Sequence, residues 1–142
     1  MLFIVGMRIN RLAAVHRWLP VMIAMPRMLV ELARNRDLGM IGTPRTLVSG
    51  RLIMVQQYWS SYEALERYAH DAGQTHLPAW RAFNQAARRS SAVGIFHETY
   101  AVTSGNHENI YVNITEPIFM GAAVGTSAIP SGKTGSRQRM SG

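Results

Sequence analysis

The sequence predicts an α+β fold, a ferredoxin-like unit in which helices cover one face of an antiparallel sheet. The first observation is the order of the elements: strand, long helix, strand, strand, one or two helices, strand and short strand. The second is that several strands are apolar on both faces, so the face without helices also needs a cover. The third is size, because 142 residues, 47% of them hydrophobic, suffice for one domain around one core.

The first strand and the first helix open the chain. Both alternating sets of Leu2–Ile9 are apolar except at Arg8, where the second set becomes polar, and this pattern is typical of a buried strand. Asn10 is a suitable N-cap for the helix that follows, from about residue 11 to residue 34. Pro20 and Pro26 each remove a backbone donor, so we expect two helical pieces that meet near the first proline.

A hairpin and a capped helix come next. A weak strand over residues 46–49, a turn at Gly50 and a strand over residues 51–59 predict the hairpin. Ser60 can cap the following helix, and Glu63 can reach back to the Ser60 N–H, which is a capping box.

A further helix is predicted from residue 75 to about residue 87. Gly73 ends the helix before it. His76, Trp80 and Phe83 recur on one side of the new helix at helical spacing.

Two strands and a tail complete the chain. The strands are expected over residues 93–103 and 107–114, and Pro117 ends regular structure. Residues 118–142 are rich in small residues with scattered basic ones, so we expect a disordered tail after a domain that spans residues 1–117.

The composition excludes several classes of protein. The formal charge of +7 is spread along the chain, without a basic stripe that carries aromatics, so we expect no nucleic-acid partner. The apolar run over residues 12–33 contains charges and prolines and will not span a bilayer. The absence of cysteine excludes disulfides and thiolate chemistry and suits the cytoplasm. The histidines lack the spacing of a zinc or non-haem iron site.

The apolar second face of the sheet predicts a homodimer. Two copies that pack these faces together form a closed barrel and hide the patch. The polar ends of the strands would then line a pocket. The candidates for that lining are Arg8, Gln56 or Gln57, Tyr58, His97 or Glu98, and Tyr111 or Asn113.

His76 is the most suggestive single residue. An imidazole can ligate iron when neutral, and it can act as a base near neutral pH. The alternative is a histidine at a helix start whose ring is satisfied by the backbone or by a partner subunit. Trp80 and Phe83 would accordingly be pocket wall or simple core.

His97 and Glu98 are neighbours in a strand, so one faces the pocket and the other faces the helices or the dimer seam. A buried carboxylate is costly unless paired, and Arg8 could hold Glu98 with two hydrogen bonds. That pair could be structural, or Arg8 could anchor a substrate. The choice between His97 and Glu98 stays open, because a shift of one residue in register exchanges the faces.

Three further residues have two interpretations each. Asn10 is a helix cap or a ligand group. Tyr58 and Tyr111 donate to a substrate carbonyl, or they only pack.

The segment YWSSYEALERYAHDAGQTHLPAW resembles the strand–Trp–helix–His segment of the antibiotic-biosynthesis-monooxygenase-like superfamily of dimeric α+β barrels. The stretches GMRINR, VHRWLPV, HLPAWRAFN, HETY and YVN are similar to one bacterial monooxygenase-family branch of unknown role. The resemblance covers roughly residues 2–117.

The resemblance implies a homodimer with a small-molecule pocket between sheet and helices. Some members oxygenate polycyclic aromatic substrates with O₂ and without metal or flavin. Others bind haem, among them haem-degrading enzymes and aldoxime dehydratases. His76 lies close to the ligand position of the haem-degrading members, and Asn10 loosely matches one of their asparagines.

We therefore expect an oxygenase-like enzyme that acts on a hydrophobic, aromatic or polyketide-like substrate and requires no cofactor. The expected catalytic residues are His76, His97, Glu98 and Arg8. The expected substrate-binding residues are Asn10, Tyr58, Trp80, Phe83, Tyr111 and Asn113. One alternative is a haem protein with His76 as its axial ligand. A second is a non-catalytic ligand-binding or scaffold dimer.

Overall fold

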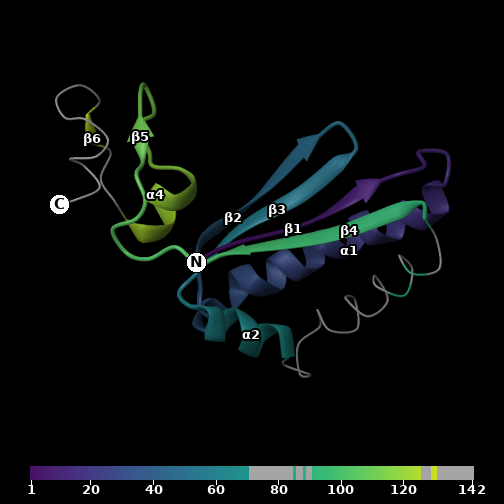
Figure 1. Ribbon diagram of the computed structural model, residues 1–142, viewed down its shortest axis with the longest axis horizontal. Coiled ribbons are helices and arrows are strands. Elements are labelled where there is room, and N and C mark those ends of the chain that lie inside the picture. The colour runs from purple at the N-terminus through teal and green to yellow at the C-terminus, as the bar shows by residue number, and fades with distance from the viewer. Residues whose placement is uncertain (71–84, 86–87, 89–90, 126–128, 131–142) are drawn as a thin grey trace.

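Four antiparallel strands form the central sheet, in the order β2-β3-β1-β4 (Figure 1). This is the ferredoxin-like order that the sequence predicts. The strands are β1 (Leu2–Ile9), β2 (Met40–Ser49), β3 (Leu52–Trp59) and β4 (Val93–Tyr100). The computed structural model describes residues 1–70, 85, 88, 91–125 and 129–130.

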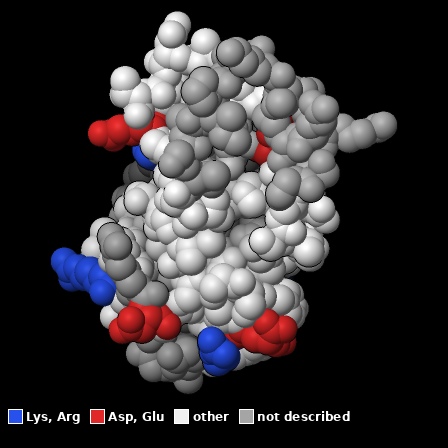
Figure 2. Space-filling model, turned by 90° about the vertical axis from the view of Figure 1, so that its left-hand side faces the viewer, with Lys and Arg blue, Asp and Glu red and all other residues white. Residues whose placement is uncertain are grey.

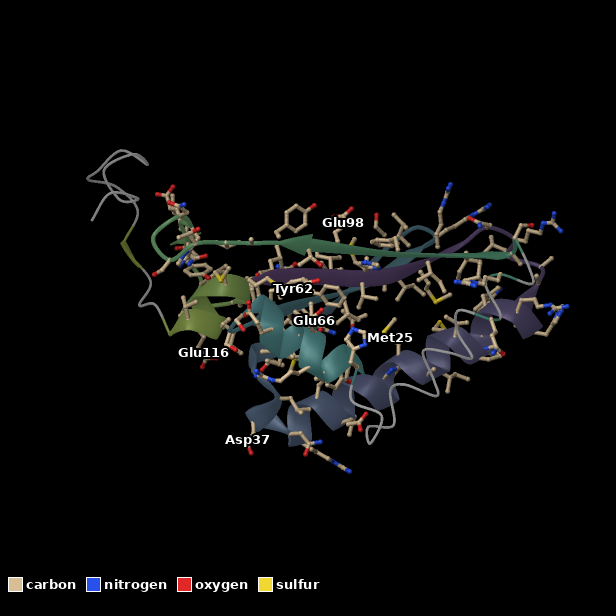
Figure 3. The ribbon with its side chains drawn as sticks, turned by 60° about the horizontal axis from the view of Figure 1, so that its bottom comes forward. Met25, Asp37, Tyr62, Glu66, Glu98 and Glu116 are labelled. Carbon is tan, nitrogen blue, oxygen red and sulfur yellow. The ribbon has the colours of Figure 1, made fainter. Side chains whose placement is uncertain are left out.

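Two helices, α1 (Val15–Arg34) and α2 (Tyr62–His70), lie on the same side of the sheet (Figures 1 and 3). A short 3₁₀ turn, Arg36–Leu38, connects α1 to β2. The other side of the sheet carries no helix over its middle and is called the open face below.

One half of the core lies between the centre of the sheet and α1. Met7 and Ile9 of β1 and Val93 of β4 are buried against Val21 of α1. The alternation along β1 is as the sequence predicts, and the structure shows that its odd-numbered residues are the set that faces the helices.

The other half of the core is built around Trp59. The indole is fully buried with Leu32 of α1 and Tyr68 of α2, and its ring centroid lies 5.4 Å from that of Tyr68. Its N–H donates a 3.0 Å hydrogen bond to the side-chain oxygen of Gln57, which is also buried. Burial of an indole requires such a partner, because an unpaired polar group in a core is costly.

The prediction that α1 begins at residue 11 in two pieces is wrong. The helix begins at Val15 and runs unbroken through Pro20 and Pro26. Both prolines are exposed, so each lost hydrogen bond lies on the solvent side while the opposite stripe stays packed on the sheet.

Asn10 is not the cap of α1, as the sequence suggested. Its side-chain N–H group donates to the Ser91 carbonyl oxygen at 3.0 Å, which ties the end of β1 to the start of β4. The residue before α1, Ala14, has no side chain that could cap the helix.

The cap of α2 is also one residue later than predicted. Ser61 Oγ accepts from the Ala64 N–H at 3.2 Å, whereas the Ser60 N–H donates to the Gly39 carbonyl. Ser60 still belongs to the hydrogen-bonded end of the sheet, so it cannot serve the helix.

A C-terminal segment folds against one end of the sheet. It contains β5 (Ile110–Tyr111), α4 (Phe119–Val124) and β6 (Ile129–Pro130), which pairs in parallel with β5. α4 lies inside the stretch that we expected to be disordered, and the strand expected over residues 107–114 is shorter than predicted. Gly42, with a φ of 69°, lets the α4 backbone at Ala123 approach β2 closely. The rest of the predicted tail lies outside the described residues.

A helix that crosses a bilayer needs about 20 predominantly apolar residues, and α1 and α2 are the longest helices that the structure describes. None of them is both long and apolar enough to cross a membrane.

Candidate functional site

The structure places His97 on the helix side of the sheet and Glu98 on the open face. His97 pairs with Val5, whose odd-numbered neighbours face the helices. The His97 ring lies beside that of Phe3, with ring centroids 6.1 Å apart. Glu98 points away from α1 and α2 (Figure 3). The register therefore decides which of the two side chains faces the helices.

A group of three side chains stands on the helix side near the end of β4. Phe3 packs against the Trp59 core, Gln57 is buried beneath, and His97 is exposed on the edge strand. An imidazole in contact with both solvent and an aromatic wall can exchange protons with water and with an apolar substrate.

The predicted pair between Arg8 and Glu98 does not form. Arg8 pairs with Gly94, whereas Glu98 pairs with Ile4, four residues away along the same strand. At about 3.3 Å per residue the two side chains start roughly 13 Å apart. Glu98 instead accepts a 2.6 Å hydrogen bond from the Tyr100 hydroxyl, which raises the pKa of Tyr100.

Tyr58, Gln56 and Tyr111 come together on the other side, at the end of the sheet that meets α4. Tyr58 is 4% exposed, and the Gln56 amide N–H donates to its hydroxyl at 2.5 Å. Burial raises the pKa of Tyr58, although the hydrogen bond from Gln56 opposes that shift. The Tyr111 hydroxyl donates to the Ile118 carbonyl at 2.5 Å, just before α4. This cluster fastens the C-terminal segment to the sheet.

The remaining predicted residues lie elsewhere. Arg8 and Asn10 are exposed at the opposite end of β1 from the Tyr58 cluster. Asn113 is exposed and has a φ of 58°, which is typical of an asparagine in a tight turn. Three predicted residues lie outside the described residues: His76, Trp80 and Phe83.

The predicted set is therefore not one site in the described part of the chain. It divides into a helix-side group with His97, an open-face cluster with Tyr58, and exposed residues at the far end of β1. Sequence reasoning missed Phe3 and the Gln57–Trp59 pair. Gln57 was one of two glutamines offered as pocket lining, and its place between Val55 and Trp59 on the alternating apolar set of β3 could have indicated burial instead.

Two further features of the described residues bear on a ligand. They contain no group of three histidine or acidic side chains that could hold a metal ion. A small cavity of about 80 Å³ lies beside the irregular part of β2. Its lining carries no ionisable side chain: Ala33, Met40, Gly42, Thr43 and Pro44.

Comparison with known proteins decides the family. A family model described as Monooxygenase af470-like matches residues 1–120. The chain belongs to this family. The match includes the whole sheet, both helices and the start of α4.

Two individual relatives illustrate the likeness. Monooxygenase af470 of Aspergillus fumigatus is 31% identical over 96 residues, which cover 63% of this chain and 32% of the relative. The chain therefore matches only about a third of the length of that protein. A crystal structure from Deinococcus radiodurans, described as a candidate antibiotic biosynthesis monooxygenase, is 16% identical. It covers 79% of this chain and all of its own, with a TM-score of 0.44. The fold class stands on the strand order of the sheet itself.

Proposed function

We propose that the chain is a monooxygenase-like enzyme that acts on a hydrophobic small molecule, with His97 as its general base. The membership in the Monooxygenase af470-like family supports the reaction class. The single structural observation that carries the assignment of the base is the place of His97 on the helix side, beside Phe3.

The proposed substrate carries an acidic C–H or O–H group on an apolar, aromatic or polyketide-like body. The apolar body would lie against Phe3 and the half-buried Ile95, while His97 removes the proton. The resulting electron-rich anion can react with O₂. For a methylene group the balance is CH₂ plus O₂ giving C=O plus H₂O, so no outside reductant is needed.

Gln57 has a supporting role in this proposal. Its side-chain oxygen is occupied by the Trp59 N–H, so it holds the floor of the helix-side group rather than contacting substrate. Glu98 and Arg8 face the other side, and we no longer assign them catalytic roles.

A homodimer remains part of the proposal. The open face presents Leu2, Ile4, Leu52 and Met54, all half-buried, so this part of the face is apolar although no helix covers it. A monomer that leaves such an area in water is prone to association, and a second copy is the economical cover.

The test combines an absorbance spectrum with oxygen uptake. Purified protein is offered a panel of hydrophobic phenols and ketones with acidic methylene groups, and uptake is followed with an oxygen electrode. With ¹⁸O₂, mass spectrometry of the product should show one labelled atom. The protein should be colourless, also after incubation with haem.

Three outcomes would overturn the proposal in different ways. A Soret band that His76→Ala removes would favour the haem alternative. A ligand that binds tightly and returns unchanged, without oxygen uptake, would favour the non-catalytic alternative. Oxygen uptake by His97→Gln at the rate of the unaltered protein would remove the assigned base.

A further inference from the structure

The fold gathers arginines that are spread along the sequence. The β1 end, the β2–β3 turn and the start of α1 meet at one end of the sheet. The Ile9 N–H donates to the Arg51 carbonyl at 2.9 Å, and the Arg11 N–H donates to the Ala92 carbonyl at 3.2 Å. We call this region the basic end. Its exposed cationic side chains are Arg8, Arg11, Arg17 and Arg51.

The described acidic side chains lie away from the basic end. α1 starts at the basic end and reaches Glu31 only in its last turn, and Asp37 follows it. Figure 3 shows Asp37, Glu66 and Glu116 toward the opposite end of the molecule, with nitrogen-tipped side chains at the basic end. Figure 2 views that opposite end, where acidic side chains appear beside basic ones. The described part of the basic end therefore has no carboxylate to neutralise it.

The start of α1 makes this arrangement costly for stability. Its first turn contains no acidic residue, it has no side-chain cap, and Arg17 lies in it. A helix N-terminus carries a partial positive charge, which acidic side chains stabilise and basic ones do not. The positive potentials of the helix and the arginines add at this end. Stability alone therefore does not explain the pattern, whereas an anionic partner would.

Exposed aliphatic side chains stand among these arginines. Leu12, in the loop before α1, is 53% exposed, and Val48, in the β2–β3 hairpin, is 69% exposed. Val15, in the first turn of α1, is 44% exposed. The Trp18 indole is partly buried, and its N–H is held by the Leu12 carbonyl at 3.0 Å. The loop before α1, the first turn of α1 and the end of β2 thus present exposed aliphatic side chains at the basic end.

We propose that the basic end docks on the surface of an anionic phospholipid bilayer. The arginines bind lipid phosphates, and Leu12, Val15 and Val48 enter the boundary between headgroups and acyl chains. The aliphatic tips favour this partner over nucleic acid, whose phosphates arginines alone can bind and which gains little from exposed aliphatic side chains. The inference does not depend on the proposed oxygenase activity.

The test is co-sedimentation of the full chain with vesicles of phosphatidylcholine, alone or mixed with phosphatidylserine. The protein should bind the mixed vesicles and not the neutral ones, and binding should weaken as salt rises. Arg11→Gln and Arg17→Gln should each lower the partition coefficient about fivefold. Arg34→Gln and Arg67→Gln, which remove the same charge away from the basic end, should leave it unchanged.

A second set of variants separates lipid from other anions. Leu12→Ser and Val48→Thr keep the charge and should weaken vesicle binding. They should leave binding of a single-stranded oligonucleotide, where any occurs, unchanged. Circular dichroism melts check that each variant is folded. We expect all of them to fold, because the substituted positions are exposed. The proposal would be overturned if the protein bound neutral vesicles as well as it binds the mixed ones. It would also be overturned if Arg34→Gln and Arg67→Gln lost as much vesicle binding as Arg11→Gln and Arg17→Gln. Oligonucleotide binding with the same arginine dependence and no vesicle binding would overturn it as well.

Discussion

Arg45 and Glu98 lie in the same row across the open face, on the two edge strands of the sheet. Arg45 pairs with Gln56, Gln56 pairs with Ile4, and Ile4 pairs with Glu98. Three strand spacings of about 4.8 Å separate them, so they cannot form an ion pair within one subunit. A twofold axis parallel to the strands, between two open faces, exchanges the sheet edges. It would place Arg45 of one copy over Glu98 of the partner subunit.

This relationship gives the first prediction. In a face-to-face homodimer Arg45→Glu and Glu98→Arg should each weaken association, because like charges then meet. The double variant should restore it. Native mass spectrometry and sedimentation of dilute protein measure the dimer fraction. Arg67→Glu on α2 is the control and should change nothing. A monomer at all concentrations, or no rescue in the double variant, would contradict this dimer.

The buried hydrogen bond between Trp59 and Gln57 gives the second prediction. Gln57→Leu leaves the indole N–H without an acceptor inside the core. We expect the free energy of unfolding to fall by about 1–3 kcal/mol in urea titrations. Gln85→Leu makes the same substitution at an exposed position and should change it by less than about 0.5 kcal/mol. Equal stability of the two variants would show that Gln57 does not satisfy the indole.

Gly6 gives the third prediction, with Gly94 on the adjacent strand as its control. A Cβ at Gly6 would lie 2.7 Å from the Ile53 carbonyl oxygen and 2.7 Å from the Phe96 ring. Gly6→Ala should therefore cost about 1–3 kcal/mol in the free energy of unfolding. A Cβ at Gly94 meets nothing closer than 3.6 Å, so Gly94→Ala should be neutral or slightly stabilising. If Gly94→Ala lowered the free energy of unfolding more than Gly6→Ala, the register between β1 and β4 would have to be a different one.

The buried Tyr58 hydroxyl gives a prediction about alkaline pH. In the unfolded chain a tyrosine ionises near pH 10, and burial raises the pKa of Tyr58 in the fold. The unfolded state therefore loses its proton first as pH rises. The stability contribution is complete below about pH 10 and is lost as pH passes through the folded pKa.

Urea titrations between neutral and strongly alkaline pH measure this loss. Tyr58→Phe should make the decline in the free energy of unfolding shallower than in the unaltered protein. Tyr62→Phe, at a position that is 56% exposed, should leave the slope as it was. A slope that Tyr58→Phe does not change would show that its hydroxyl is not desolvated.

Periodicity predicted the sheet well, because each strand has an apolar set that must meet the helices. Met7 and Ile9 of β1 and Trp59 of β3 lie where alternation puts them. Register could not be predicted, since it depends on which residues pair across strands. Only the pairing of His97 with Val5 decides that His97, and not Glu98, faces the helices.

Local signals failed where tertiary contacts decide. The exposed prolines of α1 do not divide the helix, because its buried stripe holds it to the sheet. The short α4 forms where its composition favours disorder. There, Gly121 fits closely against the Tyr111 ring, and Gly42 gives space to Ala123. These contacts join residues that are distant in the sequence, so no local sequence pattern could reveal them.

The central claim is that His97 takes a proton from a hydrophobic substrate that O₂ then oxidises. The most direct measurement is the rate of oxygen uptake with the best substrate of the panel, for His97→Gln beside His107→Gln. His97→Gln should lower kcat at least about a hundredfold, while melting as the unaltered protein does. His107→Gln should keep the full rate. Equal rates for the two variants would contradict the account.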